Sequence, residues 1–124
     1  MSKIFLLLAL SVCSLWAVKF HSYKDALILQ KESGKIIMLD VIRSDCHYCE
    51  DMNEKVFKNV EMSRWLKKRF IPVQLNLDSD TLPLGLEVHF TPTFFFIDKN
   101  SKILKKIPGA WNIEDFKDLT KGIK

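Results

Sequence analysis

The 124-residue chain has few of the residues that build metal centres, with only three cysteines and three histidines. A tetrahedral zinc site needs about four ligands, and His21 and His89 show no paired ligand spacing. Covalent haem attachment needs a histidine directly after the second cysteine of a C-x-x-C pair, and Glu50 stands at that position. We therefore expect no metal site and no cofactor.

Long runs of one kind of residue are also missing. No low-complexity tract or internal repeat is visible, and basic residues form only short runs such as 67–69. The formal net charge of +4 indicates a solvated surface, so we expect no nucleic-acid binding. The 48% hydrophobic content is ordinary, and 124 residues suffice for one small globular domain.

The N-terminus carries an uncharged apolar run, residues 4–17, after Lys3. This run is shorter than the roughly 20 apolar residues of a membrane span. A basic start, an apolar run and small residues at its end are typical of a secretory signal peptide. We predict a signal peptide over residues 1–17 and a domain over residues 18–124 that is secreted across an inner membrane into the periplasm.

Three alternatives remain open for this segment: cleavage after Ser14, an uncleaved N-terminal membrane anchor, and a lipid anchor on Cys13. Removal of residues 1–17 deletes Cys13 and leaves Cys46 and Cys49 as the remaining cysteines. A disulfide between two cysteines so close in sequence would not stabilise a secreted protein by closing a long loop. This arrangement favours a reactive pair.

Cys46-His47-Tyr48-Cys49 is the most informative motif, because it directly follows the apolar stretch 36–42. A C-x-x-C pair between a buried strand and a helix is typical of thiol–disulfide exchange. Unpaired N–H groups and the positive end of the dipole at the start of a helix favour a thiolate. We expect Cys46 to attack and Cys49, one turn along, to resolve the mixed disulfide. A structural disulfide and a metal-binding thiol pair are the alternatives.

Hydrophobic periodicity predicts an α/β fold. A strand, a helical stretch and a second strand form a parallel βαβ unit, and a terminal hairpin adds antiparallel strands, which gives a central mixed β-sheet flanked by helices on both faces. We expect helices over 22–32 (capped by Ser22), 46–58 (capped by Ser44 or Asp45), 61–69 and 112–119 (capped by Asn112), with one or two helical turns over 84–88. We expect strands over 35–42, 71–77, 93–97 and 102–107.

Asp40 interrupts an otherwise apolar strand. A buried carboxylate is costly unless it is paired or protonated. Asp40 stands six residues before Cys46, so the turn into the helix can bring it beneath the cysteine pair, where it would accept a proton from Cys49. The alternative is a solvent-facing Asp at a frayed strand end.

Thr91-Pro92-Thr93 precedes another apolar strand. A proline at a strand entrance fits an edge, and it is also where a cis bond turns the backbone. Such a turn would let Thr91 pair with an extended substrate strand. Two aromatic side chains are open to two interpretations: Tyr48 contacts substrate or packs on its helix, and Trp111 lines the rim of the active surface or packs inside.

Taken together, these pieces resemble the thioredoxin fold and are similar to secreted bacterial thioredoxin-like disulfide reductases. The matching features are Asp40 and Cys46-x-x-Cys49, residues 75–78, Thr91-Pro92-Thr93 and residues 108–110. The resemblance implies that Pro92 is cis and lies against the cysteine pair. It also implies that Asp40 is the buried acid of the family.

The chain departs from thioredoxin at several positions. Tryptophan and Gly-Pro are absent around the cysteines, Gln74 replaces a lysine near the buried acid, and Thr91 replaces isoleucine. A Thr before the cis-proline also occurs in disulfide isomerases and related oxidoreductases. These changes leave the direction of electron flow open.

Charges around the cysteines favour the reducing direction. A protonated His47 would stabilise the thiolate and make the couple more oxidising. The negative charges of Asp45, Glu50 and Asp51 disfavour the thiolate and make the couple more reducing. We expect these three acids to have a larger effect on the thiolate than His47. We therefore expect a monomeric enzyme that reduces protein disulfides and is itself reduced by a donor thiol protein. A disulfide oxidase or isomerase and a metal-binding thiol chaperone are the alternatives.

Overall fold

Four strands form one mixed sheet in the order β2-β1-β3-β4. The strands are β1 (Ile36–Ile42), β2 (Phe70–Asn76), β3 (Thr93–Ile97) and β4 (Ile103–Pro108). β1 is parallel to β2 and antiparallel to β3, and β3 is antiparallel to β4. The computed structural model describes residues 17–124. The predicted signal peptide therefore lies outside the described residues except for Ala17, while the predicted mixed sheet is confirmed.

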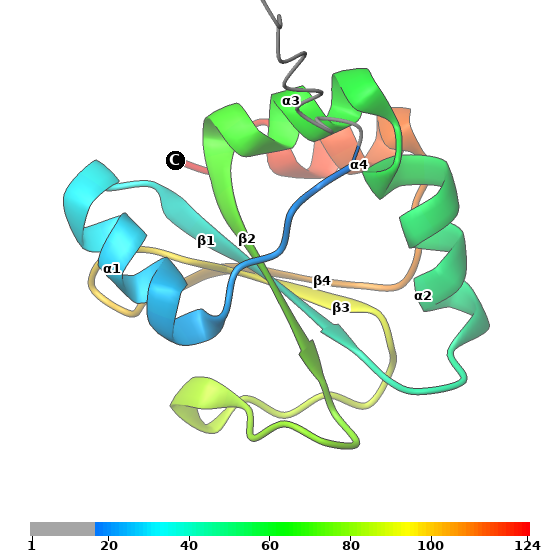
Figure 1. Cartoon of the computed structure of the whole chain (residues 1–124), viewed down its shortest axis with the longest axis horizontal. Helices are drawn as coiled ribbons and strands as arrows, with labels where there is room; N and C mark the ends of the chain where they lie inside the picture. Colours follow the sequence, from blue (N-terminus) through cyan, green and yellow to red (C-terminus); the bar gives the residue numbers. More distant parts are fainter. Residues whose placement is uncertain (1–16) are drawn as a thin grey trace, which may run out of the picture.

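Helices cover both faces of this sheet (Figure 1). They are α1 (Tyr23–Ser33), α2 (His47–Met52), the π-helix η1 (Asn53–Phe57), α3 (Val60–Arg69), the 3₁₀ turn η2 (Pro83–Gly85) and α4 (Ile113–Thr120). Ser22 caps α1 by accepting the Asp25 N–H at 3.1 Å, and Asn112 caps α4 by accepting the Asp115 N–H at 2.8 Å. Both predicted caps are confirmed. Between residues 17 and 124, no helix is both long and apolar enough to cross a membrane.

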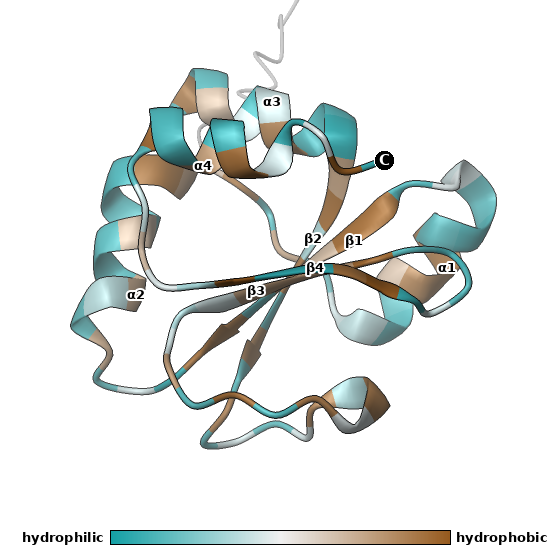
Figure 2. Ribbon diagram, turned by 180° about the vertical axis from the view of Figure 1, so that it is seen from behind, coloured by the Kyte–Doolittle hydropathy of each residue, from teal (hydrophilic) through white to brown (hydrophobic). Residues whose placement is uncertain are grey.

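β1 is buried on both faces, which explains its nearly continuous apolar sequence. Ile36 and Met38 pack with residues of α2, η1, α3 and α4, whereas Ile37, Leu39 and Val41 pack on the face that α1 covers. Figure 2 shows the brown of β1 inside the molecule and much of the teal on the helices. Because side chains alternate along a strand, Asp40 shares the face of Met38 and lies on the side of α2.

Phe57 is the centre of an aromatic cluster beneath these helices. Its side chain is 1% exposed, and its ring meets those of Phe20, Phe94 and Phe116 edge-on at 5.5, 6.0 and 6.3 Å between centroids. Edge-to-face pairs add to the stabilisation from apolar burial. Phe20 belongs to the segment before α1. This segment also hydrogen-bonds to β2, because the His21 N–H donates to the Pro72 carbonyl at 2.9 Å.

Two predicted helical segments are wrong in part. The stretch 46–58 changes after Met52 from α-helix to π-helix, with the Lys58 N–H reaching the Asn53 carbonyl five residues back at 3.0 Å. The predicted turns over 84–88 shrink to η2, because Leu84 has a left-handed φ of 58° and Leu86 returns to extended backbone. Neither effect has a periodic signal in the sequence.

Replacing Phe57 by Ala should lower the free energy of unfolding by about 3–5 kcal/mol, because it removes a buried ring and leaves a cavity. Denaturant titration followed by circular dichroism measures the change. Phe90→Ala is the matched control, since that ring is 73% exposed, and it should cost no more than about 0.5 kcal/mol. Equal losses in the two variants would contradict the assigned core.

Candidate active site

A disulfide joins Cys46 and Cys49 at the start of α2. Their Cα atoms lie 5.2 Å apart, within the usual range for a disulfide. Cys46 itself is the N-cap residue, and its Sγ accepts the N–H of Cys49 at 3.2 Å. Both cysteines are partly exposed. One of the unpaired N–H groups at the start of the helix is therefore directed at the reactive sulfur.

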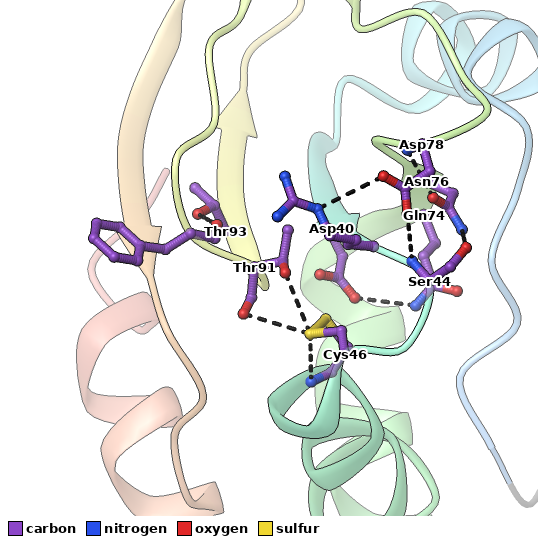
Figure 3. Close-up of a disulfide and its surroundings, with 11 residues drawn as sticks. Asp40, Ser44, Cys46, Gln74, Asn76, Asp78, Thr91 and Thr93 are labelled. Atoms are coloured by element: carbon purple, nitrogen blue, oxygen red, sulfur yellow. Dashed lines mark hydrogen bonds and ion pairs between the residues drawn. A yellow bond between two sulfur atoms is a disulfide. The ribbon is translucent and has the colours of Figure 1, made fainter.

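The expected cap at Ser44 or Asp45 is wrong. Asp45 has a left-handed φ of 53°, which turns the chain before the helix begins. The Ser44 hydroxyl accepts the Asn76 side-chain N–H at 3.2 Å, and the Ser44 backbone N–H donates to Asp78 Oδ2 at 3.0 Å (Figure 3). These contacts tie the turn to the end of β2, and Cys46, the residue after Asp45, takes the capping position.

Thr91 and Pro92 lie against the disulfide. The Thr91 hydroxyl donates to Cys46 Sγ at 3.3 Å, and the Thr91 carbonyl oxygen lies 3.5 Å from the same sulfur (Figure 3). The Thr91–Pro92 peptide bond is cis, and Pro92 is buried. The Pro92 carbonyl accepts the Gly109 N–H at 2.8 Å. Backbone groups of Thr91 are thereby presented beside Cys46.

Asp40 is buried, with 1% of its surface exposed, so the interpretation as a solvent-facing residue is wrong. The strand register puts it opposite Gln74 on β2, and the Gln74 amide donates to Asp40 Oδ2 at 3.1 Å. Among the described residues, Oδ1 has no hydrogen-bond partner. Burial raises the pKa of Asp40 to about 7, against a smaller lowering by the Gln74 hydrogen bond.

Gln74 connects this carboxyl group to the cysteines. A pocket of about 240 Å³ is lined by Gln74 and by both Cys46 and Cys49, together with Val18 and Phe20 from the segment before α1. Since Gln74 also donates to Asp40, the buried acid lies one hydrogen bond from the space that both sulfurs border. This geometry suits proton exchange between Cys49 and Asp40 through water.

His47 and Tyr48 point away from this pocket and into solvent. The His47 side chain is 80% exposed, and its Nε2 lies 3.5 Å from Asp51 Oδ2. Lys55 Nζ lies 3.8 Å from the other oxygen of Asp51. Tyr48 is 63% exposed, and its ring meets that of His47 on the same helix edge-on at 5.9 Å between centroids.

Phe90, Val18 and Phe20 are site residues that the sequence did not reveal. Phe90 directly precedes Thr91 and is 73% exposed. An aromatic residue next to the Thr-Pro segment is a sequence signal that could have indicated it. Val18 and Phe20 reach the cysteine pocket only through tertiary contacts. Within residues 17–124, no group of three or more His, Cys, Asp or Glu side chains is arranged to hold a metal ion.

Replacing Asp40 by Asn should make the oxidised protein more stable above neutral pH. The folded-state pKa of about 7 exceeds the ordinary value of 3.8, so the contribution of Asp40 to stability is greatest below about pH 4 and is lost as the pH rises toward 7. The difference corresponds to roughly 4 kcal/mol. Denaturant unfolding between pH 4 and 9 measures it, with the exposed Asp118→Asn as control. A stability difference independent of pH would contradict the raised pKa.

Replacing Thr91 by Val should make the Cys46–Cys49 couple more reducing. The hydroxyl that donates to Cys46 Sγ stabilises a thiolate more than a disulfide sulfur, because hydrogen bonds to charged acceptors are stronger. Loss of roughly 1–1.5 kcal/mol lowers the potential by about 20–30 mV. Equilibration with glutathione buffers measures this shift. The exposed Thr81→Val should leave the potential unchanged, and an unchanged potential in Thr91→Val would remove this role.

Known proteins share this architecture. A solved thioredoxin from Thermus thermophilus is 26% identical, with a TM-score of 0.71 over 86% of this chain and 87% of that chain. A structure titled "DsbH Oxidoreductase" has a TM-score of 0.68 at 21% identity, over 86% of each chain. Mouse Anterior gradient protein 3 is 23% identical over 92 residues, which are 74% of this chain and 56% of that protein.

The match to a described family covers most of the chain. Residues 23–124 match the family described as "Thioredoxin-like domain". That range contains the cysteine pair, Asp40, Gln74 and the cis-proline segment. The fold and the position of its cysteine pair agree with this match, and the chain belongs to the thioredoxin-like domain family.

Proposed function

We propose that this protein is a thiol:disulfide oxidoreductase that reduces protein disulfides outside the cytoplasm. One observation carries the proposal: the Cys46–Cys49 disulfide caps α2 while Thr91, before the cis-proline, contacts the sulfur of Cys46. The reactive bond is thus partly exposed beside backbone groups that suit an extended chain. Structural neighbours titled thioredoxin and oxidoreductase support the same activity.

The reaction begins with the reduced pair. The Cys46 thiolate attacks one sulfur of a client disulfide, forms a mixed disulfide and releases the other client sulfur as a thiolate, which takes a proton from water. Cys49 then loses its proton to Asp40 through the shared pocket and attacks Cys46 Sγ. The second client thiolate leaves and is protonated, two electrons have passed to the client, and the Cys46–Cys49 disulfide remains. A donor dithiol protein reduces this disulfide and becomes oxidised itself.

The reducing direction rests on the charges near the cysteines. Glu50 and Asp51 lie in α2 and Asp45 precedes it, so three acids surround the turn. His47 lies within 3.5 Å of Asp51, which offsets any positive charge that the imidazole offers to Cys46. Negative charges nearby disfavour the Cys46 thiolate of the reduced enzyme. They therefore lower the redox potential, which makes the enzyme a better reductant.

The extracytoplasmic location rests on the N-terminal sequence. Lys3, the apolar run and the small residues before Val18 are typical of a signal peptide, and a periplasmic compartment follows from it. An uncleaved anchor at the same membrane is the alternative. Clients would be exported proteins with disulfides, and the donor would be a thiol protein that reaches the same compartment. We expect the enzyme to work as a monomer.

A disulfide oxidase or isomerase is the second candidate, and the Thr91 hydroxyl favours it. A hydrogen-bond donor at 3.3 Å from Cys46 Sγ stabilises the thiolate of the reduced enzyme. This raises the redox potential and makes the enzyme a stronger oxidant. The redox potential separates the two candidates. A value near that of thioredoxin, about −270 mV, supports the reductase, whereas one near −120 mV, typical of strong oxidants, would overturn it.

Insulin reduction with a dithiol donor tests the activity itself. Cys46→Ser should abolish turnover, because it removes the attacking sulfur. Cys49→Ser should instead accumulate a covalent mixed disulfide with the client, since attack proceeds without resolution. Non-reducing mass spectrometry distinguishes the two variants. Wild-type rates in Cys46→Ser, or a trapped adduct on Cys46→Ser rather than Cys49→Ser, would refute the assigned roles.

A further inference from the structure

We propose that a groove between Tyr48 and Trp111 binds a large apolar side chain of the client, close to the disulfide that the enzyme reduces. The groove gives the enzyme a preference for extended protein segments in which a bulky apolar residue flanks the reactive cysteine. This inference rests on the proposed function. It adds a side-chain specificity that the cysteines and the cis-proline segment do not supply.

The groove lies between one face of α2–η1 and the start of α4. Its volume is about 570 Å³, within the usual range for ligand sites of about 300–1,000 Å³. Four residues at helical spacing form one wall, and residues 110–114 form the other. The members of the first wall are Tyr48, Asp51, Met52 and Lys55.

Trp111 forms a fixed apolar surface in this groove. Its indole N–H donates to the Pro108 carbonyl at 3.1 Å, and its backbone N–H lies 3.2 Å from Met52 Sδ. The side chain nevertheless remains 38% exposed. An aromatic ring that is held in place and still meets water offers contact area at little conformational cost on binding. Tyr48, 63% exposed, offers a second aromatic surface opposite.

A second pocket adjoins the groove on the side of Thr91. This pocket of about 270 Å³ shares Tyr48 and Ala110 with the groove and is also lined by Phe90 and Thr91. Thr91 contacts Cys46 Sγ. We therefore expect a client cysteine bonded to Cys46 to lie beside this second pocket, with a neighbouring client residue within reach of the Tyr48–Trp111 groove.

The rim of the groove adds a charge preference. Lys55 Nζ lies 3.8 Å from Asp51 Oδ1 and offsets part of its charge. Glu114, in the first turn of α4, has no ion pair among residues 17–124. A basic client residue next to the apolar one would therefore meet an uncompensated carboxylate. This exposed contact contributes less than the apolar burial.

Two disulfide-bonded peptides that differ in one residue beside the cysteine, Trp or Ser, test the proposal. We expect the reduced wild-type enzyme to act on the Trp peptide with about tenfold higher kcat/KM. Trp111→Ala should bring this ratio to about threefold or less, and Tyr48→Ala should lower it in the same direction. Ile28→Ala, 54% exposed on α1, is the control and should keep the wild-type ratio.

Each result decides something different. A ratio near one in the wild type, or a wild-type ratio in both groove variants, would overturn the groove. Failure to reduce either peptide would instead refute the proposed function, and the groove with it. If Trp111→Ala does not fold, as judged by circular dichroism, the Tyr48→Ala ratio alone decides.

A second peptide pair, with Lys or Glu next to the Trp, tests the rim. The Lys peptide should react about twofold faster at low salt, and the preference should shrink as the ionic strength rises. Glu114→Gln should remove this preference. A preference that survives Glu114→Gln would remove the assigned role of Glu114.

Discussion

The register of β1 against its two neighbours positions every reactive group of this protein. β1 lies between β2 and β3, and this pairing places Asp40 opposite Gln74 on one side and Phe94 on the other. Slippage by one residue would turn Asp40 to the opposite face of the sheet, away from α2. The large side chains that β1 buries on both faces would have to repack on such a slippage, and the strand ends at the turn before Cys46.

A neutral partner on the buried acid shapes the chemistry. Gln74 gives Asp40 a single hydrogen bond and no positive charge, so the cost of burying the carboxylate dominates and the acid favours its protonated form toward neutral pH. A lysine at this position would stabilise the ionised form instead. A pKa near neutral pH is what the proposed role of Asp40 as proton acceptor for Cys49 requires.

The surroundings of Cys46 combine opposing influences. The Cys49 N–H and the Thr91 hydroxyl donate to its sulfur, whereas Asp45, Glu50 and Asp51 add negative charge to the same turn. Exposed aromatic rings on the same side, Tyr48 and Phe90, have no packing role in the core. Both rings line a pocket with Thr91, which is where the proposed function would bring a client chain.

The local pattern of the sequence was enough to predict the order of the elements, two helix caps, the mixed sheet and the position of the cysteine pair. It did not predict the cap at Cys46, the π-helix after Met52 or the single turn at Pro83–Gly85. Each of these depends on contacts between segments distant in the chain or on one backbone angle. The same holds for the pocket residues Val18 and Phe20 and for the Trp111 groove. Periodicity and turn residues act over a few neighbours, so the sequence alone determined which elements form and where the thiols lie. Only tertiary packing decided which side chains meet around those thiols, because burial and register bring together residues that no local interaction connects.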